Sequence, residues 1–181
     1  WSNSSSSQSI TVSSSGNYFI TVTDANNCSA STSQSVTVNS LPVASITPSG
    51  PTTFCQGGNV LLTASGGNNY LWSNNSLLQS ITVSSSGNYF VTVTDVNNCS
   101  ASSSAVTVTV NPNPPIPNII FNFDSLVSDA ASGYQWYFNS VLIPTANSQS
   151  YHPILNGNYS VVITDANNCT ASSADYPFIM T

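Results

Sequence analysis

The sequence predicts an all-β chain made of tandem small β-sandwich domains, and three observations lead to this prediction. Short stretches alternate polar and apolar residues, no segment shows a helical period, and one phrase occurs three times. Residues 8–31 and 79–102 are identical at 22 of 24 positions at an offset of 71, and residues 149–172 are a looser third copy. A period near 70 residues is too long for a solenoid repeat and is typical of a small sandwich domain.

The strands expected in chain order are rich in Val, Ile, Thr and Tyr, which favour strands. Examples are residues 9–12, 18–22, 60–64, 106–110 and 159–163. Ser/Gly/Asn clusters separate them and predict turns at residues 13–17, 66–69, 84–88 and 156–158.

An Asp-x-Asn-Asn tetrad follows a strand in each copy, at Asp24–Asn27, Asp95–Asn98 and Asp165–Asn168. Asp and Asn tolerate positive φ and hydrogen-bond their own backbone, so each tetrad predicts the tip of a β-hairpin. Such oxygen-rich tips can also bind Ca²⁺, but each offers only one carboxylate, so we expect turns without a metal.

Prolines mark the expected domain boundaries, in Asn39–Pro42 and in the spacer Asn111–Pro117. We therefore expect the C-terminal half of a domain at 1–40, a complete domain at 41–111 and a variant domain at 112–181. Trp1 aligns with Trp72, so the first copy should lack the half that precedes this Trp, and the chain should continue a longer protein.

The charge balance excludes several classes of function. The chain has no Lys and no Arg, and its six acidic residues, all Asp, give a formal net charge of −6. Nucleic acid and anionic lipid should be repelled, so we expect no nucleic-acid partner. His152 is the only histidine and no Lys is present, so no Ser nucleophile has an obvious base, and we expect no enzyme, catalytic residue or cofactor. The four cysteines form no CxxC motif, which argues against zinc.

The cysteines of the middle domain predict a staple. Cys55, Trp72 and Cys99 follow one another in an order that resembles the immunoglobulin arrangement, in which a core Trp packs on a disulfide between two sheets. We expect a Cys55–Cys99 disulfide, with two buried free thiols as the alternative. Cys28 occupies the position of Cys99, so its partner should lie in the missing half. Cys169 has no obvious mate, because the alignment places Ile119 at the position of Cys55.

Residues 48–112 contain the phrases TFCQGG, YLWS, QSITVSSSGNY and TVTDVNNCSA. Together they resemble the tandem immunoglobulin-like or PKD-like repeats of large surface proteins of Bacteroidota, among them gliding-motility adhesins. That family usually has Asn-Gly-Cys where this chain has Asn-Asn-Cys. Residues 134–172 resemble the last such module, which commonly precedes a C-terminal sorting domain of the type IX secretion system. The resemblance implies immunoglobulin-like domains, an extracellular or cell-surface location and no catalytic residue. It implies neighbouring repeats and the outer-membrane anchoring machinery as partners.

These observations favour a non-catalytic stalk of a secreted adhesin or filament that mediates attachment. Two alternatives remain: a spacer of a secreted enzyme, and a carbohydrate-binding module that would meet surface glycans through Trp136, Tyr137 and Tyr151. The alternation of residues makes core packing the expected role of Trp136. Asp124-Ser125-Leu126 resembles the O-glycosylation sequon of exported proteins in the same bacterial group, so Ser125 is a candidate glycan site, or otherwise an ordinary strand residue.

Overall fold

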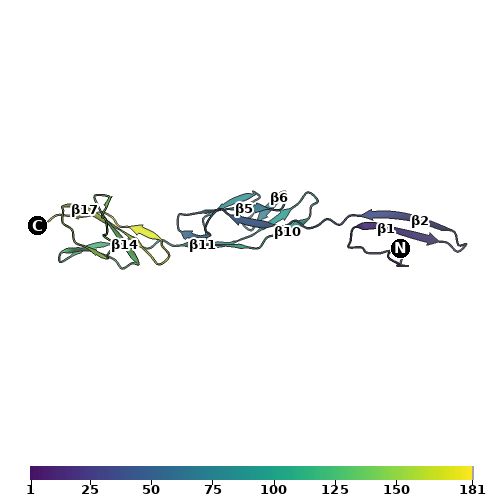
Figure 1. Ribbon diagram of the computed structural model, residues 1–181, viewed down its shortest axis with the longest axis horizontal. Helices are drawn as coiled ribbons and strands as arrows, with labels where there is room; N and C mark the ends of the chain where they lie inside the picture. The colour runs from purple at the N-terminus through teal and green to yellow at the C-terminus, as the bar shows by residue number, and fades with distance from the viewer. Residues whose placement is uncertain (181) are drawn as a thin grey trace.

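The computed structural model describes residues 1–180, which form strands, turns and loops without a helix. The all-β prediction is confirmed. Figure 1 shows three units that follow one another along a single long axis, with the N-terminal hairpin at one end and the C-terminus at the other. The described residues contain no helix long and apolar enough to cross a membrane.

The first unit is a single antiparallel hairpin of β1 (Gly16–Thr23) and β2 (Ser29–Val36). No second sheet covers it among the described residues, and Phe19 is half exposed. The strand predicted at residues 9–12 does not form, although the same sequence forms β7 (Ser80–Val83) in the middle unit. β7 pairs with β5 (Val60–Ser65), and residues 9–12 have no such partner strand, which is why the same sequence stays irregular there.

The middle unit is a sandwich of two antiparallel layers. One layer contains β3 (Ser45–Pro48), β5 and β7. The other is made of two sheets that are continuous through β8 (Gly87–Tyr89) and β9 (Val91–Thr94), which only Phe90 separates. β9 pairs with β6 (Asn69–Trp72) and β10 (Ser100–Ser102), and β8 pairs with β11 (Val106–Asn111). The short strand β4 (Thr53–Cys55) adds to β11 in parallel. This strand order confirms the predicted immunoglobulin-like sandwich.

The third unit repeats this plan, but it lacks a counterpart of β4 and has one additional edge strand. Its first layer is β12 (Ile119–Asn122), β13 (Ser125–Ser128) and β16 (Ser150–Tyr151). Its second layer is β14 (Gly133–Phe138), β15 (Val141–Leu142), β17 (Gly157–Thr164), β18 (Thr170–Ser172) and β19 (Tyr176–Phe178). Only Phe123 and Asp124 join β12 to β13, whereas residues 49–59 join β3 to β5 and include β4. The third unit therefore has no counterpart of β4, and Ile119 begins the counterpart of β3 instead of replacing Cys55.

Each sandwich has its own core, built around one fully buried Trp. The indole N–H of Trp72 donates to Leu78 O at 2.8 Å, and that of Trp136 donates to Ser148 O at 2.9 Å. Each buried indole N–H therefore has the hydrogen-bond partner that burial requires. The apolar residues buried with Trp72 are Val60, Leu62, Ala64, Ile81, Val83, Val91, Val93 and Val108. Those buried with Trp136 are Ile119, Leu126, Tyr159, Val161 and Ile163.

Candidate functional site

Cys55 lies at the end of the middle unit that faces the third unit. It is the last residue of β4, in register with Asn111, the last residue of β11. The next residue, Gln56, donates its N–H to Asn111 O at 2.8 Å and accepts from the Asn113 amide at 3.3 Å. These bonds fix Cys55 beside the point where the chain leaves the middle unit.

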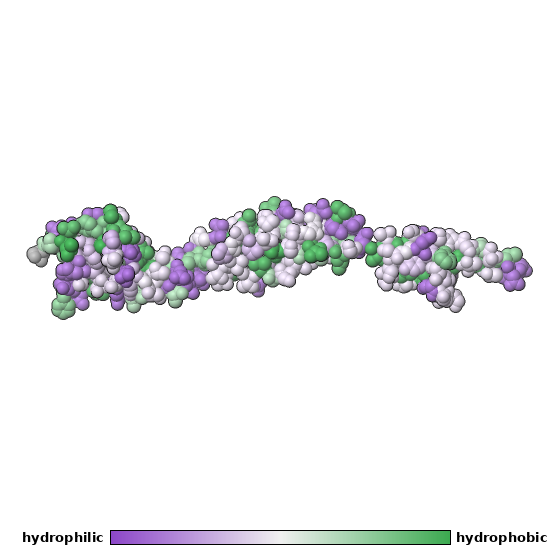
Figure 2. Space-filling model, viewed as in Figure 1, coloured by the Kyte–Doolittle hydropathy of each residue, from purple (hydrophilic) through white to green (hydrophobic). Residues whose placement is uncertain are grey.

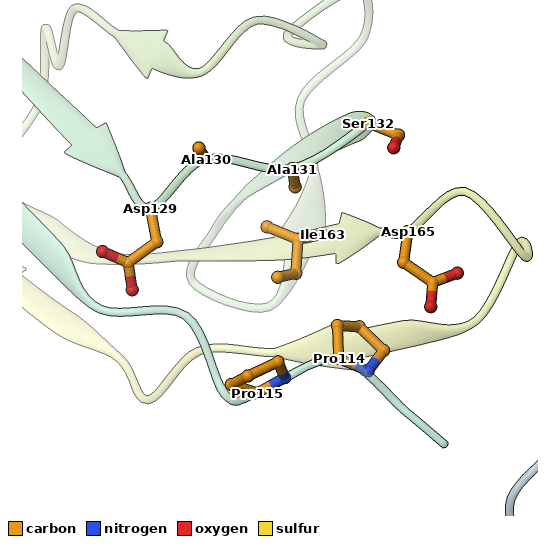
Figure 3. A pocket seen from close by; sticks show the side chains of 8 residues that line it. All are labelled: Pro114, Pro115, Asp129, Ala130, Ala131, Ser132, Ile163 and Asp165. Carbon is orange, nitrogen blue, oxygen red and sulfur yellow. The ribbon is translucent and has the colours of Figure 1, made fainter. Parts of the chain in front are cut away.

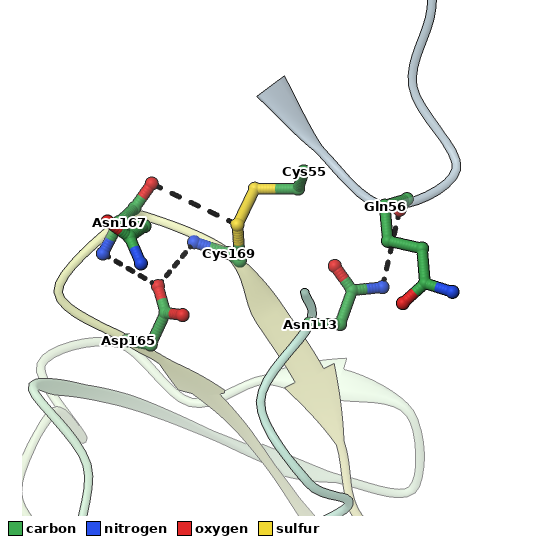
Figure 4. The surroundings of a disulfide bond; sticks show 6 residues. All are labelled: Cys55, Gln56, Asn113, Asp165, Asn167 and Cys169. Carbon is green, nitrogen blue, oxygen red and sulfur yellow. Dashed lines mark hydrogen bonds between the residues drawn. A yellow bond between two sulfur atoms is a disulfide. The ribbon is translucent and has the colours of Figure 1, made fainter. Parts of the chain in front are cut away.

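Cys169 lies at the facing end of the third unit, directly after the turn between β17 and β18. The structure joins it to Cys55 by a disulfide with a Cα–Cα separation of 5.5 Å, across 114 residues of sequence (Figure 4). Cys169 is fully buried. A loop of this length adds about 5 kcal/mol of stability in the chain-entropy model. The bridge ties two separate sandwiches together, and it is typical of a protein that works in an oxidising compartment.

The predicted Cys55–Cys99 disulfide is wrong. Cys55 lies beside Asn111, and β11 runs antiparallel to β8 with Val108 opposite Gly87. Cys99 follows the turn after Thr94, at the opposite end of the sandwich. The strand from Gly87 to Thr94 alone spans about 23 Å, far beyond the roughly 7 Å that a disulfide tolerates between Cα atoms. Cys99 is instead a partly exposed free thiol, and Trp72 packs among apolar side chains.

The Asp-x-Asn-Asn tetrads form the predicted hairpin tips in all three units. At Cys169 the Asp165 Oδ1 atom accepts the N–H groups of Asn167 and Cys169, each at 2.8 Å. Asn168 has a φ of 62°, which Asn tolerates better than most residues. The carboxylate is thus committed to the turn that presents the cysteine. No group of three or more His, Cys, Asp or Glu residues within 1–180 is placed to hold a metal ion.

A hollow of about 540 Å³ lies beside the bridged joint, between the linker and the third unit (Figure 3). Pro114 and Pro115 line one side, and Ile163 lies at the centre between Asp129 and Asp165. Asp129 accepts the N–H of Asn118 at 2.8 Å, so both carboxylates hold backbone in place. The hollow seats the linker and offers no acid–base pair.

The structure does not gather the remaining candidate residues into one site. Ser125 starts β13, which lies between β12 and β16, and its hydroxyl donates to Asp124 Oδ1 at 2.8 Å. Ser125 is therefore on a central strand, not on a free edge. His152 is exposed, and its Nδ1 atom lies 3.7 Å from Asp124 Oδ2.

The aromatic residues proposed as a sugar platform have different roles. Trp136 is fully buried, as the alternation predicted, whereas Tyr137 is half-buried. Tyr151 packs on Trp136 and Tyr159, with ring centroids 6.0 and 5.8 Å apart. Burial raises the pKa of Tyr151 above its usual value, and the nearby Tyr159 adds to this rise.

Exposed apolar side chains gather on the third unit, toward the C-terminal end of the molecule (Figure 2). They include Phe123, Val141, Ile154, Leu155 and Ile179. A groove of about 230 Å³ lies among Val141, Ile154, Leu155 and their neighbours.

The bridged joint is the feature that the sequence did not predict. Its only signal was that Cys55 precedes the Pro spacer and Cys169 follows it.

No family model matches the chain, and neither does any curated protein. Several solved structures align with it at low identity. One chain of a crystal structure of a mouse coronavirus receptor-binding domain complexed with its murine receptor aligns at 15% identity over 77% of this chain and 100% of the other, with a TM-score of 0.44. Murine CEACAM1b aligns at 15% identity over the same shares, with a TM-score of 0.41. A Bacteroides ovatus protein, SGBP-B in complex with a mixed-linkage heptasaccharide, aligns at 15% identity over 78% of this chain and 48% of the other, with a TM-score of 0.26. The fold assignment rests on the strand order given above, and these alignments add no argument about function.

Proposed function

We propose that this chain is a non-catalytic part of the stalk of a secreted cell-surface adhesin or filament protein. The observation that carries the proposal is the disulfide between Cys55 and Cys169, which joins two successive sandwich units. A stalk must keep its length and direction while its ends are pulled apart. A covalent bond across a joint serves this purpose directly.

The bridge changes the path along which tension would pass. Force entering from the N-terminus reaches Cys55, crosses the two sulfur atoms and leaves through Cys169. Residues 56–168 lie outside this path, and they include both buried tryptophans and nearly all of both cores. Tension on the stalk therefore does not pass along residues 56–168, although it can still pull on the edge strands β3 and β19.

The disulfide and the family resemblance support the cell-surface location in this proposal. The disulfide favours an oxidising compartment, and the phrases shared with Bacteroidota surface repeats favour export by the type IX secretion system. On this proposal the partners are neighbouring immunoglobulin-like repeats and the outer-membrane anchoring machinery. Burial of Trp136 removes the flattest candidate surface for sugar, so we favour the stalk over a carbohydrate-binding module.

Glycosylation of Ser125 belongs to the same proposal. Ser125 is the first residue of β13, directly after the exposed Asp124 of the two-residue turn that follows β12. Mass spectrometry of the native protein should find a hexose-containing modification on the peptide that spans residues 118–130. An unmodified peptide at full occupancy would exclude the glycan, whereas a chain from a host without the transferase would give no test.

The stalk role can be tested on the cell that produces the protein. A full-length variant with Cys55→Ser and Cys169→Ser loses the bridge, and the exposed β2 residue change Ser35→Ala is the matched control because it leaves every cysteine in place. At equal surface amounts, measured with an antibody, we expect normal static attachment but earlier detachment of the double variant under rising shear. Equal detachment of both variants, or absence of the protein from the cell surface, would contradict the proposal.

A further inference from the structure

The three hairpin tips present their cysteines in the same way. The Asp24 Oδ1 atom accepts the Cys28 N–H at 2.9 Å, and the Asp95 Oδ1 atom accepts the Cys99 N–H at 2.9 Å. The third tip has the same bond at 2.8 Å, to Cys169, and only that cysteine is bridged. Because the local geometry is the same, what differs between the three is the neighbouring unit.

The end of the first unit matches the end of the middle unit that carries Cys55. Ser86 Oγ accepts the N–H of Val110 at 2.8 Å, and Ser15 Oγ accepts the N–H of Val38 at 2.8 Å. Residues 37–39 are therefore the counterparts of residues 109–111, where β4 pairs in parallel. Within residues 1–180 no strand pairs with residues 37–39, so this edge is open.

The two linkers also meet the following unit in similar places. At the second joint, Pro114 and Pro115 lie against Ile163. At the first joint, the linker residue Val43 lies against Gly66, where an added Cβ would be 1.9 Å from Val43 O. Gly66 has a φ of +103°, a backbone conformation that is strained for any residue with a side chain. Both contacts are at the end of the unit where the Asp-x-Asn-Asn tip emerges.

We propose that Cys99 is half of a second inter-unit disulfide, whose other half is a cysteine on a strand that adds in parallel to residues 37–39. The occupant has the chemistry of β4, a Thr-Phe-Cys strand that places its cysteine beside Asn39 as Cys55 lies beside Asn111. Bond formation removes two protons and two electrons from the two thiols, and a small disulfide oxidant accepts them and becomes two thiols. This inference rests on the geometry of the bridged joint and does not depend on the stalk role.

On this proposal every bridge joins a unit to the unit that follows it in the sequence. Each complete unit supplies a cysteine strand at one end and receives a cysteine strand from the preceding unit at the other. The third unit receives one through Cys169 but has no counterpart of β4 within residues 112–180. The ladder of bridges therefore ends in the third unit.

The first test uses the chain with a peptide of residues 51–58, Pro-Thr-Thr-Phe-Cys-Gln-Gly-Gly, activated as a mixed disulfide with thionitrobenzoate. A thiolate of the protein attacks the peptide sulfur and releases thionitrobenzoate, which is measured by absorbance, and peptide mapping locates the product. We expect labelling of Cys99 to be about tenfold faster than labelling of Cys28, because strand addition holds the peptide near Cys99. Exposure alone predicts the reverse order, since Cys28 is exposed and Cys99 is only partly so.

Two controls make this test decisive. The reversed peptide, Gly-Gly-Gln-Cys-Phe-Thr-Thr-Pro, has the same composition and should label Cys99 no faster than Cys28. Thr109 N–H donates to Thr52 O at 2.8 Å, and Thr37 is the counterpart of Thr109 in the first unit. Thr37→Pro removes this N–H, so the variant should lose the preference for Cys99. Equal labelling of Cys28 and Cys99 by the native peptide would overturn the proposal.

The second test places a copy of residues 41–71 before Trp1, which completes the first unit because Trp1 aligns with Trp72. The added copy of Cys55 can then form one of two bonds. It can pair with Cys28 of its own unit or with Cys99 of the next unit. We expect peptide mapping to find the bond to Cys99 and a free Cys28. With Cys99→Ser the added cysteine should remain a thiol. A bond to Cys28 would overturn the proposal, and a non-reducing gel separates bonds within one chain from bonds between two molecules.

Discussion

Pulling a single molecule by its two ends should show that the bridge hides most of the chain from force. The perturbation is removal of the bridge, by reduction or by Cys55→Ser with Cys169→Ser. With the bridge intact, only the residues before Cys55 and after Cys169 can extend. Strands such as β3 and β19 can then be peeled away, while residues 56–168 stay closed.

The expected magnitude follows from the length of the loop. The bridged residues are 114 positions apart and their Cα atoms are 5.5 Å apart. A fully extended chain spans about 3.5 Å per residue, so removing the bridge should release roughly 400 Å of additional contour length. That release should come in two events, because the middle and third units have separate cores.

The assay is atomic-force or optical-trap extension at constant speed, with and without reductant. A Cys28→Ser, Cys99→Ser chain is the matched control, because it removes both free thiols and should behave as the original chain does. Two unfolding events with full domain lengths in the oxidised chain would contradict this prediction. So would a reduced chain with the same total extension as the oxidised one.

Three further predictions concern stability in the chain with the bridge reduced, measured by denaturant unfolding. Asp165→Ala removes the acceptor of two backbone N–H groups and should lower the free energy of unfolding by about 1–2 kcal/mol. Asp175→Ala, at an exposed residue, should lower it little. Equal losses for the two variants would contradict the role of Asp165 in the turn. Trp72→Ala leaves a cavity in the middle core and should cost about 3–5 kcal/mol. Trp1→Ala is its control, because Trp1 lies before β1 in a unit without a second sheet, and similar losses of unfolding free energy for both would contradict this argument. The raised pKa of Tyr151 means that the folded state holds the phenol proton more tightly than the unfolded state does. The stability that this phenol contributes to the folded state is therefore complete below pH 10 and is lost as pH rises above that value. Tyr151→Phe should make the decline of unfolding free energy above pH 10 shallower, and an unchanged slope would count against burial of this phenol.

Local sequence predicted the strands and turns where each strand had a partner within reach. Residues 60–64, 106–110 and 159–163 fall inside β5, β11 and β17, and the Asp-x-Asn-Asn tips form the expected turns. Residues 9–12 show the limit of this reasoning, because their sequence is the same as that of β7 but their partner strand is missing. Alternation specifies which face of a strand is apolar, and it does not supply the second strand.

The cysteine pairing could not be predicted from one domain because it belongs to the joint between two domains. Cys28, Cys99 and Cys169 share one local sequence and one turn, yet only Cys169 is bonded. Whether Cys55 can reach a tip depends on which end of the sandwich β4 occupies. β4 pairs in parallel with β11, the strand that leads out of the unit, so its last residue points toward the next unit. A bridge within the unit would need Cys55 at the other end of the sandwich, where Cys99 follows the turn after Thr94, more than about 20 Å away. The place of a three-residue strand therefore decides whether the chain is a row of separately stapled domains or one covalently joined rod.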